Sequence, residues 1–357
     1  MDKYFMDGHK LYWHLDRVVA WQRGETVPPV YVEISPVSFC NHKCIFCGID
    51  FARDTGYQLD AEVLGKRLEE MGVAGVRSVM FAGEGEPLLH RNLPEFAGRA
   101  KSSGMDVSVA TNGSLGTREL WKDLLPPLSW IRFSVDAGTP EVYSRVHRVQ
   151  ESSFHKTVES IRHAVDVKRE NNHNVTIGVQ YLLLKDNLED IENALQLFSG
   201  IGVDYLSFKP FSLHPLMLQR TDMDYTQEVI DGIDETVEGY RQKSAMNVIF
   251  RKTGLAKYQA REKAFAHCYA LPFWGHLSAK GDFHTCGVFL GDERFSAGNI
   301  YTEDMRALFF GAARQKSLTY GREKLPISRE CRVNCRMARV NEFLEFLENR
   351  PDHVNFI

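Results

Sequence analysis

The sequence predicts an α/β fold in which helices cover the outer side of a parallel sheet. Six short runs rich in β-branched and aromatic residues alternate with segments of helical spacing, and short turns join them. The six runs are 30–34, 77–82, 106–110, 130–135, 175–183 and 204–208. Parallel neighbours need a crossover of about a dozen residues, usually a helix, so this alternation predicts a partial (β/α)6 barrel.

Helices are expected between these strands wherever apolar residues recur on one face, as Leu64, Leu68 and Met71 do. The segments with this spacing are 60–71, 92–103, 117–125, 152–170 and 187–199. An amphipathic helix at 9–22 precedes the first strand, and Gly24 ends it. Residues 1–27 are therefore expected to form an N-terminal helical extension, and residues 28–222 the barrel.

The regular alternation ends after Pro210. A helix is expected at 225–241, a strand at 246–250 and a polar connection at 252–263. A β-hairpin at 274–286 that turns at Lys280-Gly281-Asp282 and a helix at 342–348 follow. Residues 223–262 are interpreted as a connecting helix and strand, and residues 263–357 as a small α+β domain with a hairpin and a helix.

The composition excludes several classes of protein. A chain of 357 residues, 43% hydrophobic and 25% charged, suits a globular enzyme with a sizeable core. The net charge of -4 gives no indication of a basic surface that would bind a polyanion, which disfavours nucleic acid as the main partner. No apolar run approaches the roughly 20 residues of a membrane helix, and the N-terminus lacks a signal-peptide pattern, so a cytoplasmic protein without membrane contact is expected.

The seven cysteines fall into a group of three and a group of four, and disulfides are not expected in a reducing compartment. The groups are Cys40, Cys44 and Cys47, and Cys268, Cys286, Cys331 and Cys335. Three thiolates leave a four-metal cluster with one open corner, which indicates chemistry, because structural sites are normally closed by protein ligands. The triplet follows the first strand, so it is expected at the ligand-binding edge of the sheet.

Two other interpretations of the triplet start from its residues alone. Cys44 and Cys47 could form a thioredoxin-like redox pair, and Cys40 with His42 could complete a zinc site. A redox pair normally lacks a third thiol four residues upstream, and zinc knuckles favour two separated pairs.

The Cys-x3-Cys-x-aromatic-Cys spacing, with Phe46 before the third thiol, resembles the signature of radical S-adenosylmethionine (SAM) enzymes. The segment 82–90, Ala-Gly-Glu-Gly-Glu-Pro-Leu-Leu-His, looks like the family's Gly-Gly-Glu-Pro segment, which accepts hydrogen bonds from the methionine amino group of SAM. The resemblance assigns Gly83, Gly85 and Glu86 to that contact. Glu84 occupies a position that is often glycine, which leaves open which acid makes it.

Further SAM contacts are implied by strand ends that are similar to the family's. Thr-Asn-Gly at 111–113 and Ser-Val-Asp at 134–136 match segments that line the ribose and methionine, which assigns Asn112, Ser134 and Asp136. An arginine for the SAM carboxylate is usual nearby. Arg148 is favoured over Arg145, although a solvated helix end explains either arginine.

The second cysteine group resembles the auxiliary-cluster region called twitch, a shortened relative of the SPASM domain. Cys268, Gly281, Cys286, Cys331 and Cys335 carry that pattern, and four thiols with no spare imply one closed 4Fe–4S cluster. A structural zinc site of four cysteines is the alternative. The arginines around the last pair, Arg329, Arg332, Arg336 and Arg339, either raise the potential of an anionic cluster or form an exposed helix face; both interpretations stay open.

The resemblance implies a radical SAM enzyme that takes an electron from a flavodoxin- or ferredoxin-type reductant and removes hydrogen from its substrate. All seven thiols are used by two clusters, so none is left to return a hydrogen atom to a substrate radical. This favours a two-electron oxidation, as in aminocyclitol dehydrogenases, over a cysteine-quenched epimerase. A tyrosine donor, Tyr181 or Tyr205, would restore a redox-neutral reaction.

The 39 residues before Cys40 are too few for a leader-binding domain, which favours a sugar, aminocyclitol or nucleoside substrate over a ribosomal peptide. Lys209 and His214 follow the sixth strand at the ligand-binding edge and are the candidate catalytic residues. Glu84, Gln180 and His276 are also polar, but a structural role is favoured for them. The alternatives are a peptide-modifying enzyme, a redox-neutral epimerase, dehydratase or decarboxylase, and a non-catalytic zinc or Fe–S interaction module.

Overall fold

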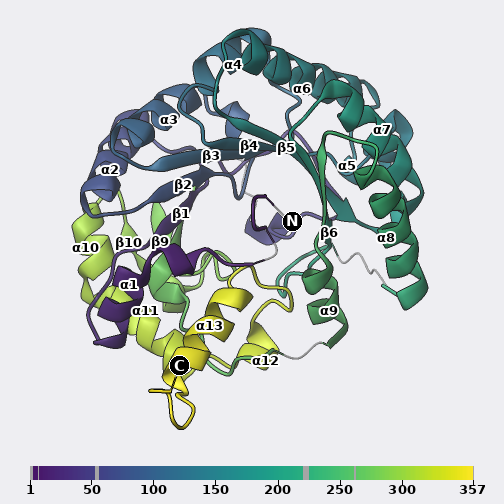
Figure 1. Cartoon of the computed structure of the whole chain (residues 1–357). Helices are drawn as coiled ribbons and strands as arrows, with labels where there is room; N and C mark the ends of the chain where they lie inside the picture. The colour runs from purple at the N-terminus through teal and green to yellow at the C-terminus, as the bar shows by residue number, and fades with distance from the viewer. Residues whose placement is uncertain (1–2, 7, 53–55, 220–224, 261–262, 357) are drawn as a thin grey trace.

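The computed structural model describes residues 3–6, 8–52, 56–219, 225–260 and 263–356. Its strands form one ten-stranded sheet in the order β10-β9-β8-β1-β2-β3-β4-β5-β6-β7. The sheet curves into an open barrel with helices on its outer side (Figure 1). The α/β class and the barrel predicted from the sequence are therefore confirmed.

The first six strands lie where the sequence patterns placed them, and each pairs in parallel with the next. They are β1 (Tyr31–Ile34), β2 (Ser78–Phe81), β3 (Asp106–Thr111), β4 (Trp130–Ser134), β5 (Thr176–Leu183) and β6 (Tyr205–Pro210). In β4 the burial alternates: Ile131 and Phe133 are fully buried, whereas Trp130, Arg132 and Ser134 are partly exposed. The period of two thus gives the strand one apolar face and one face with polar groups.

Helices cross between the strands. They are α2 (Ala61–Val73), α3 (Leu93–Ser102), α4 (Arg118–Leu124), α5 (Pro140–His147), α6 (Ser152–Glu170) and α7 (Ile191–Ile201), with the 3-10 turn η4 (Lys185–Asp190) before the last. Side-chain caps set several of the starts. Asp60 Oδ1 accepts from the Glu62 and Val63 N–H groups at 3.0 and 2.9 Å and so begins α2. The helix α5 was not predicted from the sequence.

The N-terminal helix is shorter than predicted. The segment is split at His14 into a 3-10 turn η1 (Leu11–Trp13) and α1 (Leu15–Gln22). Upstream of both, the Tyr4 ring lies against Tyr205 of β6, with 5.2 Å between the ring centroids. The start of the chain therefore lies beside the barrel strands.

The expectation that the sheet alternation stops after Pro210 is wrong. Helix α8 (Gln227–Arg241) leads to β7 (Asn247–Phe250), which pairs in parallel with β6, and the expected polar connection contains helix α9 (Lys252–Ala260). The physical reason is that the side chains of Val248, Ile249 and Phe250 are buried, so pairing β7 with β6 removes this apolar strand from solvent.

The C-terminal hairpin, β8 (Trp274–Leu277) and β9 (Asp282–His284), is antiparallel as predicted. It does not stand apart, because β8 pairs in parallel with β1. β10 (Ser296–Asn299) follows, and α10 (Met305–Phe310), α11 (Ala312–Glu323), α12 (Ile327–Glu330) and α13 (Ala338–Glu348) end the chain. The sheet is thus continuous across the boundaries that the sequence suggested for the last two parts.

Candidate active site

The cysteine triplet lies on the irregular segment that follows β1, and all three thiols are partly buried. The C-terminal end of α5 holds this segment: the Ile45 N–H donates to the Val146 carbonyl at 3.0 Å, and the Lys43 N–H donates to the His147 carbonyl at 3.2 Å. The Cys40 Sγ accepts from the His42 N–H at 3.4 Å. The triplet is therefore anchored by tertiary contacts as well as by its local sequence.

His147 connects the triplet to β4. Its Nδ1 lies 3.1 Å from Cys44 Sγ, and its Nε2 lies 3.3 Å from the Asp136 N–H. Because the backbone N–H of Asp136 can only donate, Nε2 is the acceptor and the proton sits on Nδ1, which donates to the sulfur. Burial holds the pKa of the His147 imidazole well below its usual value, which keeps the ring neutral. Phe46 packs edge-on against this ring, with 5.3 Å between centroids.

Asp136, which resemblance assigns to SAM, is fully buried. Its Oδ1 accepts from the Leu182 N–H at 2.5 Å, and its Oδ2 lies 3.6 Å from His147 Nε2. Burial raises the pKa of the carboxyl to about 7. It is the backbone N–H of Asp136 that supports the histidine contacting Cys44, a link that the sequence did not indicate.

Gly83 and Gly85 fit their positions because the backbone passes close to the segment before the triplet. Gly83 has a φ of +106°, and a Cβ there would lie 2.1 Å from Ser35 Oγ. At Gly85 a Cβ would lie 2.2 Å from the Phe39 carbonyl oxygen. Only glycine allows this approach, so the 82–90 segment lies directly against the segment that leads to Cys40.

The two acids of this segment bind different parts of the protein. Glu86 is buried; its Oε1 accepts from Thr111 Oγ1 at 2.5 Å and from the Leu88 N–H at 3.0 Å, and its Oε2 from the Asn112 N–H at 2.8 Å. Burial raises the pKa of Glu86 despite these bonds. Glu84 Oε2 accepts from the Ala279 N–H of the hairpin at 2.7 Å.

The remaining residues predicted to contact SAM lie in different surroundings. Asn112 approaches the triplet: its Nδ2 lies 2.8 Å from Asn41 Oδ1 and 4.0 Å from Cys40 Sγ. Ser134 lies partly exposed on β4, opposite Gln180 of β5. Arg148 is exposed after α5 and donates to Gln219. The role of each in SAM binding stays a prediction.

His42, the residue that the zinc interpretation paired with Cys40, is engaged elsewhere. Its Nε2 is 3.0 Å from the Tyr143 hydroxyl, and the ring is buried. Within the part of the chain that the structure describes, no group of three or more His, Cys, Asp or Glu side chains is arranged to hold a single metal ion.

The four C-terminal cysteines gather in a second hydrophobic cluster with Phe265, Leu271 and Trp274. Backbone N–H groups two residues downstream donate to three of the sulfurs: Met337 to Cys335 at 3.4 Å, Ala270 to Cys268 and Val288 to Cys286. Burial raises the thiol pKa of Cys268 and Cys286, whereas a hydrogen bond from Cys331 lowers that of Cys335. Amide donors aimed at buried sulfur fit an anionic cluster, whose charge they stabilise.

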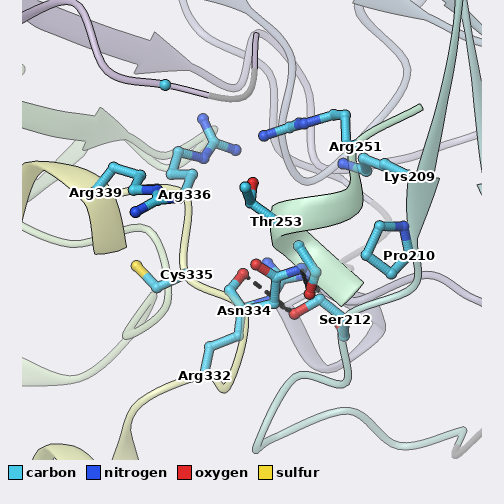
Figure 2. A pocket seen from close by; sticks show the side chains of 12 residues that line it. Lys209, Pro210, Ser212, Arg251, Thr253, Arg332, Asn334, Cys335, Arg336 and Arg339 are labelled. Atoms are coloured by element: carbon cyan, nitrogen blue, oxygen red, sulfur yellow. Dashed lines mark hydrogen bonds between the residues drawn. The ribbon is translucent and has the colours of Figure 1, made fainter. Parts of the chain in front are cut away.

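A cavity of about 120 Å³ lies between the barrel and this cysteine region (Figure 2). Its described lining is polar and strongly basic. The lining residues are Gly8, Lys209, Pro210, Ser212, Arg251, Thr253, Gly254, Arg332, Asn334, Cys335, Arg336 and Arg339. Three of the four arginines near the last cysteine pair therefore line a cavity, and Arg329 is exposed outside it.

Arg332, next to Cys331 in the second cysteine group, lies close to the segment that follows the first. Its guanidinium donates to the Ser212 carbonyl and to Ser212 Oγ, both at 3.0 Å. A Cβ on Gly48, the residue after Cys47, would lie 3.5 Å from Arg332 Nη2. The segment after the triplet and the Cys331–Cys335 loop thus meet at one side chain.

The two candidate catalytic residues occupy different places. Lys209 lines the cavity, and burial together with the arginines around it lowers the pKa of its amine well below the usual value. His214 is buried against Phe51, with 4.7 Å between ring centroids, and its Nδ1 accepts from the Leu216 N–H at 3.1 Å. Burial and Arg332 lower its pKa to about 4. His214 therefore lies at the junction of the two segments and is not part of the described cavity lining.

A buried polar network on β1 and β8 was not assigned from the sequence. Glu33 pairs with Arg336, and its Oε1 lies 3.8 Å from His276 Nδ1. The other ring nitrogen of His276 is 2.9 Å from Ser35 Oγ. Burial would raise the pKa of Glu33, but Arg336 and His276 hold it below its ordinary value. The available signal was a carboxylate inside an otherwise apolar strand, Tyr-Val-Glu-Ile at 31–34.

The fold and the triplet define a class of open-barrel protein whose first βα loop presents three sulfurs. The family model of the Radical SAM superfamily matches residues 34–198, and the chain belongs to that superfamily. Membership implies SAM and a 4Fe–4S cluster, and we expect Cys40, Cys44 and Cys47 to hold that cluster.

Two similar proteins bear the name probable GTP 3',8-cyclase. The one from Saccharolobus islandicus is 26% identical over 242 residues, 68% of this chain and 70% of the relative. The one from Metallosphaera sedula is 30% identical over 235 residues, 65% of this chain and 66% of the relative.

Solved structures are similar in fold. SuiB of Streptococcus suis bound to S-adenosylmethionine has a TM-score of 0.66 and is 16% identical, over 87% of this chain and 72% of that one. The protein anSMEcpe with bound AdoMet has a TM-score of 0.59 and 17% identity, over 85% and 88%. In the described ranges, no helix combines the length and apolar character needed to cross a membrane.

Proposed function

We propose that this protein is a radical SAM oxidoreductase that removes hydrogen from a small polar substrate of sugar, aminocyclitol or nucleoside type. The observation that carries the proposal is the polar cavity beside Cys335, joined through Arg332 to the segment that follows Cys47. A substrate in this cavity would lie between a cluster-binding triplet and four further thiols. The reductant is a flavodoxin- or ferredoxin-type protein of the cytoplasm.

Cys40, Cys44 and Cys47 would hold a 4Fe–4S cluster that binds SAM, and these groups would supply hydrogen-atom abstraction; Cys268, Cys286, Cys331 and Cys335 would hold an auxiliary 4Fe–4S cluster, which would supply an acceptor for the second electron. The chain itself must hold the sulfurs, orient the substrate and remove a proton. His147 and the amide donors hold the sulfurs. Lys209 is the proposed proton acceptor, because burial and the arginines favour its neutral form.

The overall reaction is balanced when the substrate loses one hydrogen atom, one proton and one electron. A redox-neutral reaction would need a donor that returns a hydrogen atom. Tyr181 does not suit that role, because its ring is fully buried and its hydroxyl donates to the Asn187 carbonyl at 2.6 Å. Tyr205 is buried against Tyr4. Both observations support the oxidation.

Anaerobic reconstitution tests the proposal. We expect about eight irons per chain, from two four-iron clusters, and 5′-deoxyadenosine formation from SAM and a reductant. Cys44→Ala and Cys268→Ala should each lose about four irons, and only Cys44→Ala should lose SAM cleavage altogether. Bound zinc without SAM cleavage would overturn the proposal. A product isomeric with its substrate, in place of one lighter by two hydrogens, would refute the oxidation.

Nucleotide cyclisation is a second candidate function. The similarity to proteins named GTP 3',8-cyclase and the basic lining of the cavity both favour it. Incubation with GTP, SAM and a reductant should then give a product isomeric with GTP. Unchanged GTP, with SAM cleavage intact in the same sample, would exclude this candidate.

A further inference from the structure

Arg132 is a cation on the inner face of the barrel sheet. It is the central residue of β4, between Ile131 and Phe133, which are fully buried. Phe133 packs against Trp121 of α4, with 5.6 Å between the ring centroids, so this side of the strand faces the outer helices (Figure 1). Because side chains alternate along a strand, Arg132 points to the opposite, inner side, where it is partly exposed.

The guanidinium group of Arg132 is stabilised by an aromatic ring but not by an anion. Its Cζ lies 5.4 Å from the centroid of the Trp130 ring. Its Nε is buried, and no residue of the described ranges accepts a hydrogen bond from it or forms an ion pair with the group. The Asp136 carboxyl group is influenced by the charge of Arg132, yet it accepts from the Leu182 N–H. Folding gives no reason for this cation, because a partly buried charge without a counter-ion lowers stability.

The surroundings of Arg132 are aromatic near the beginnings of the strands. Trp130 begins β4 and Tyr205 begins β6. The Tyr205 ring lies over Gly178, the β5 residue opposite Arg132, since a Cβ on that glycine would lie 2.0 Å from Tyr205 Cζ. Tyr4 packs on Tyr205 in turn. These rings occupy the inner face at the strand beginnings, so a ligand approaches Arg132 from the C-terminal edge, the edge where the triplet lies.

Arg132 lies below the residues that are expected to bind SAM and close to the proposed proton acceptor. Ser134 is on the same face of β4, two residues nearer the C-terminal edge. A strand rises about 3.3 Å per residue, so Arg132 lies about 7 Å deeper in the barrel than Ser134. Burial lowers the pKa of the Lys209 amine, and the charge of Arg132 is the next largest cause. A molecule held between the SAM site and Lys209 therefore meets Arg132.

We propose that the substrate carries a carboxylate and that Arg132 binds it. A carboxylate brings one negative charge and accepts two parallel hydrogen bonds from the edge of a guanidinium group, whose face is left to Trp130. A phosphate would bring a second negative charge, which the neutral amine of Lys209 does not balance. The inference rests on the proposed function and adds a charge to its substrate: a sugar, aminocyclitol or nucleoside with a carboxylate group.

D-Glucuronate and D-glucose are suitable probes, because they differ only in the carboxylate at C6. Each is titrated calorimetrically into the reconstituted full chain in the presence of SAM. We expect glucuronate to bind at least about tenfold more tightly than glucose. Arg132→Gln should remove this preference, and Arg132→Lys should keep part of it, because lysine retains the charge without the planar fork. The matched control is Arg162→Gln, at an exposed position on α6, which should keep the full preference.

Stability provides an independent measurement. Arg132→Gln removes a cation that has no counter-ion, so its midpoint of urea unfolding should equal or exceed that of the unaltered protein. A lower midpoint would overturn the inference, because Arg132 would then serve packing. Equal binding of the two sugars by the unaltered protein would overturn it as well, as would a preference that survives in Arg132→Gln.

The carboxylate of SAM itself is the other group that an arginine in the barrel could bind. SAM affinity should change less than about twofold in Arg132→Gln. A large loss of SAM affinity would assign Arg132 to the cofactor and overturn the inference. SAM cleavage by the unaltered protein is measured on the same preparation: cleavage without a preference for glucuronate refutes this inference alone, whereas absence of cleavage refutes the proposed function.

Discussion

Replacing His147 tests how the protein controls the sulfur of Cys44. The neutral imidazole donates from Nδ1 to Cys44 Sγ at 3.1 Å, and the Asp136 N–H fixes its tautomer through Nε2. His147→Phe keeps a buried ring but removes the donor. His147→Asn is the matched variant, because its side-chain N–H occupies nearly the position of Nδ1.

The size of the effect follows from the charge on the sulfur. A hydrogen bond to a charged acceptor contributes about 1.5–3 kcal/mol. Only the difference in this hydrogen-bond energy between the oxidised and the reduced cluster alters the reduction potential, and we take that difference as about 1 kcal/mol. For a one-electron couple this corresponds to about 40 mV. Loss of the donor destabilises the reduced, more anionic state, so the potential should fall.

Redox titration followed by electron paramagnetic resonance measures this shift on the Cys268→Ala background, where only the cluster at the triplet contributes. We expect His147→Phe to lower the midpoint by about 40 mV and His147→Asn to shift it by less than half as much. Equal iron content in both variants controls for loss of the cluster. Identical midpoints in the unaltered protein and His147→Phe would refute the role of this hydrogen bond.

Three further predictions concern stability, each followed by urea unfolding. Arg314 is fully buried, and its guanidinium donates to the Val27, Pro272 and Phe309 carbonyls at 3.1, 2.8 and 2.7 Å. Arg314→Met should therefore lower the free energy of unfolding by about 3 kcal/mol. The control Lys316→Met, at an exposed position, should lower it by less than about 0.5 kcal/mol. Equal losses would contradict this. Gly85→Ala should destabilise the protein by about 2 kcal/mol or more, because the added Cβ would clash with the Phe39 carbonyl oxygen. The control Gly98→Ala lies inside α3, where an added Cβ meets no atom within 4 Å, and should stabilise the protein by about 0.5 kcal/mol. An unchanged stability in Gly85→Ala would be inconsistent with the packing described. Burial raises the pKa of Glu84 from 4.5 to about 6. Between pH 4.5 and pH 6 the folded state therefore binds more protons than the unfolded state, so stability falls as the pH rises. Through Glu84 alone, the protein should be about 2 kcal/mol less stable at pH 7 than at pH 4. Glu84→Gln should remove that part of the pH dependence, and an unchanged profile would argue against it.

The carboxylates of the 82–90 segment illustrate why contacts of single residues were hard to predict. The sequence placed two acids, Glu84 and Glu86, after the second strand but could not say which would face a ligand. In the structure Glu86 binds the end of β3 and Glu84 binds the hairpin at Ala279. Both partners lie far from the acids in sequence, so no local pattern indicated them.

The sequence by itself determined the barrel strands, the positions of most helices and both cysteine groups. These features depend on local periodicity and on the spacing of a few thiols, which neighbouring residues encode directly. Tertiary structure alone decided that β7 and β8 close onto the edges of the barrel sheet, that His147 contacts Cys44, and that arginines from separate segments converge on one cavity. Each of these depends on strand pairing or packing between residues distant in the chain, where the energy belongs to the pair and neither partner's sequence surroundings reveal it.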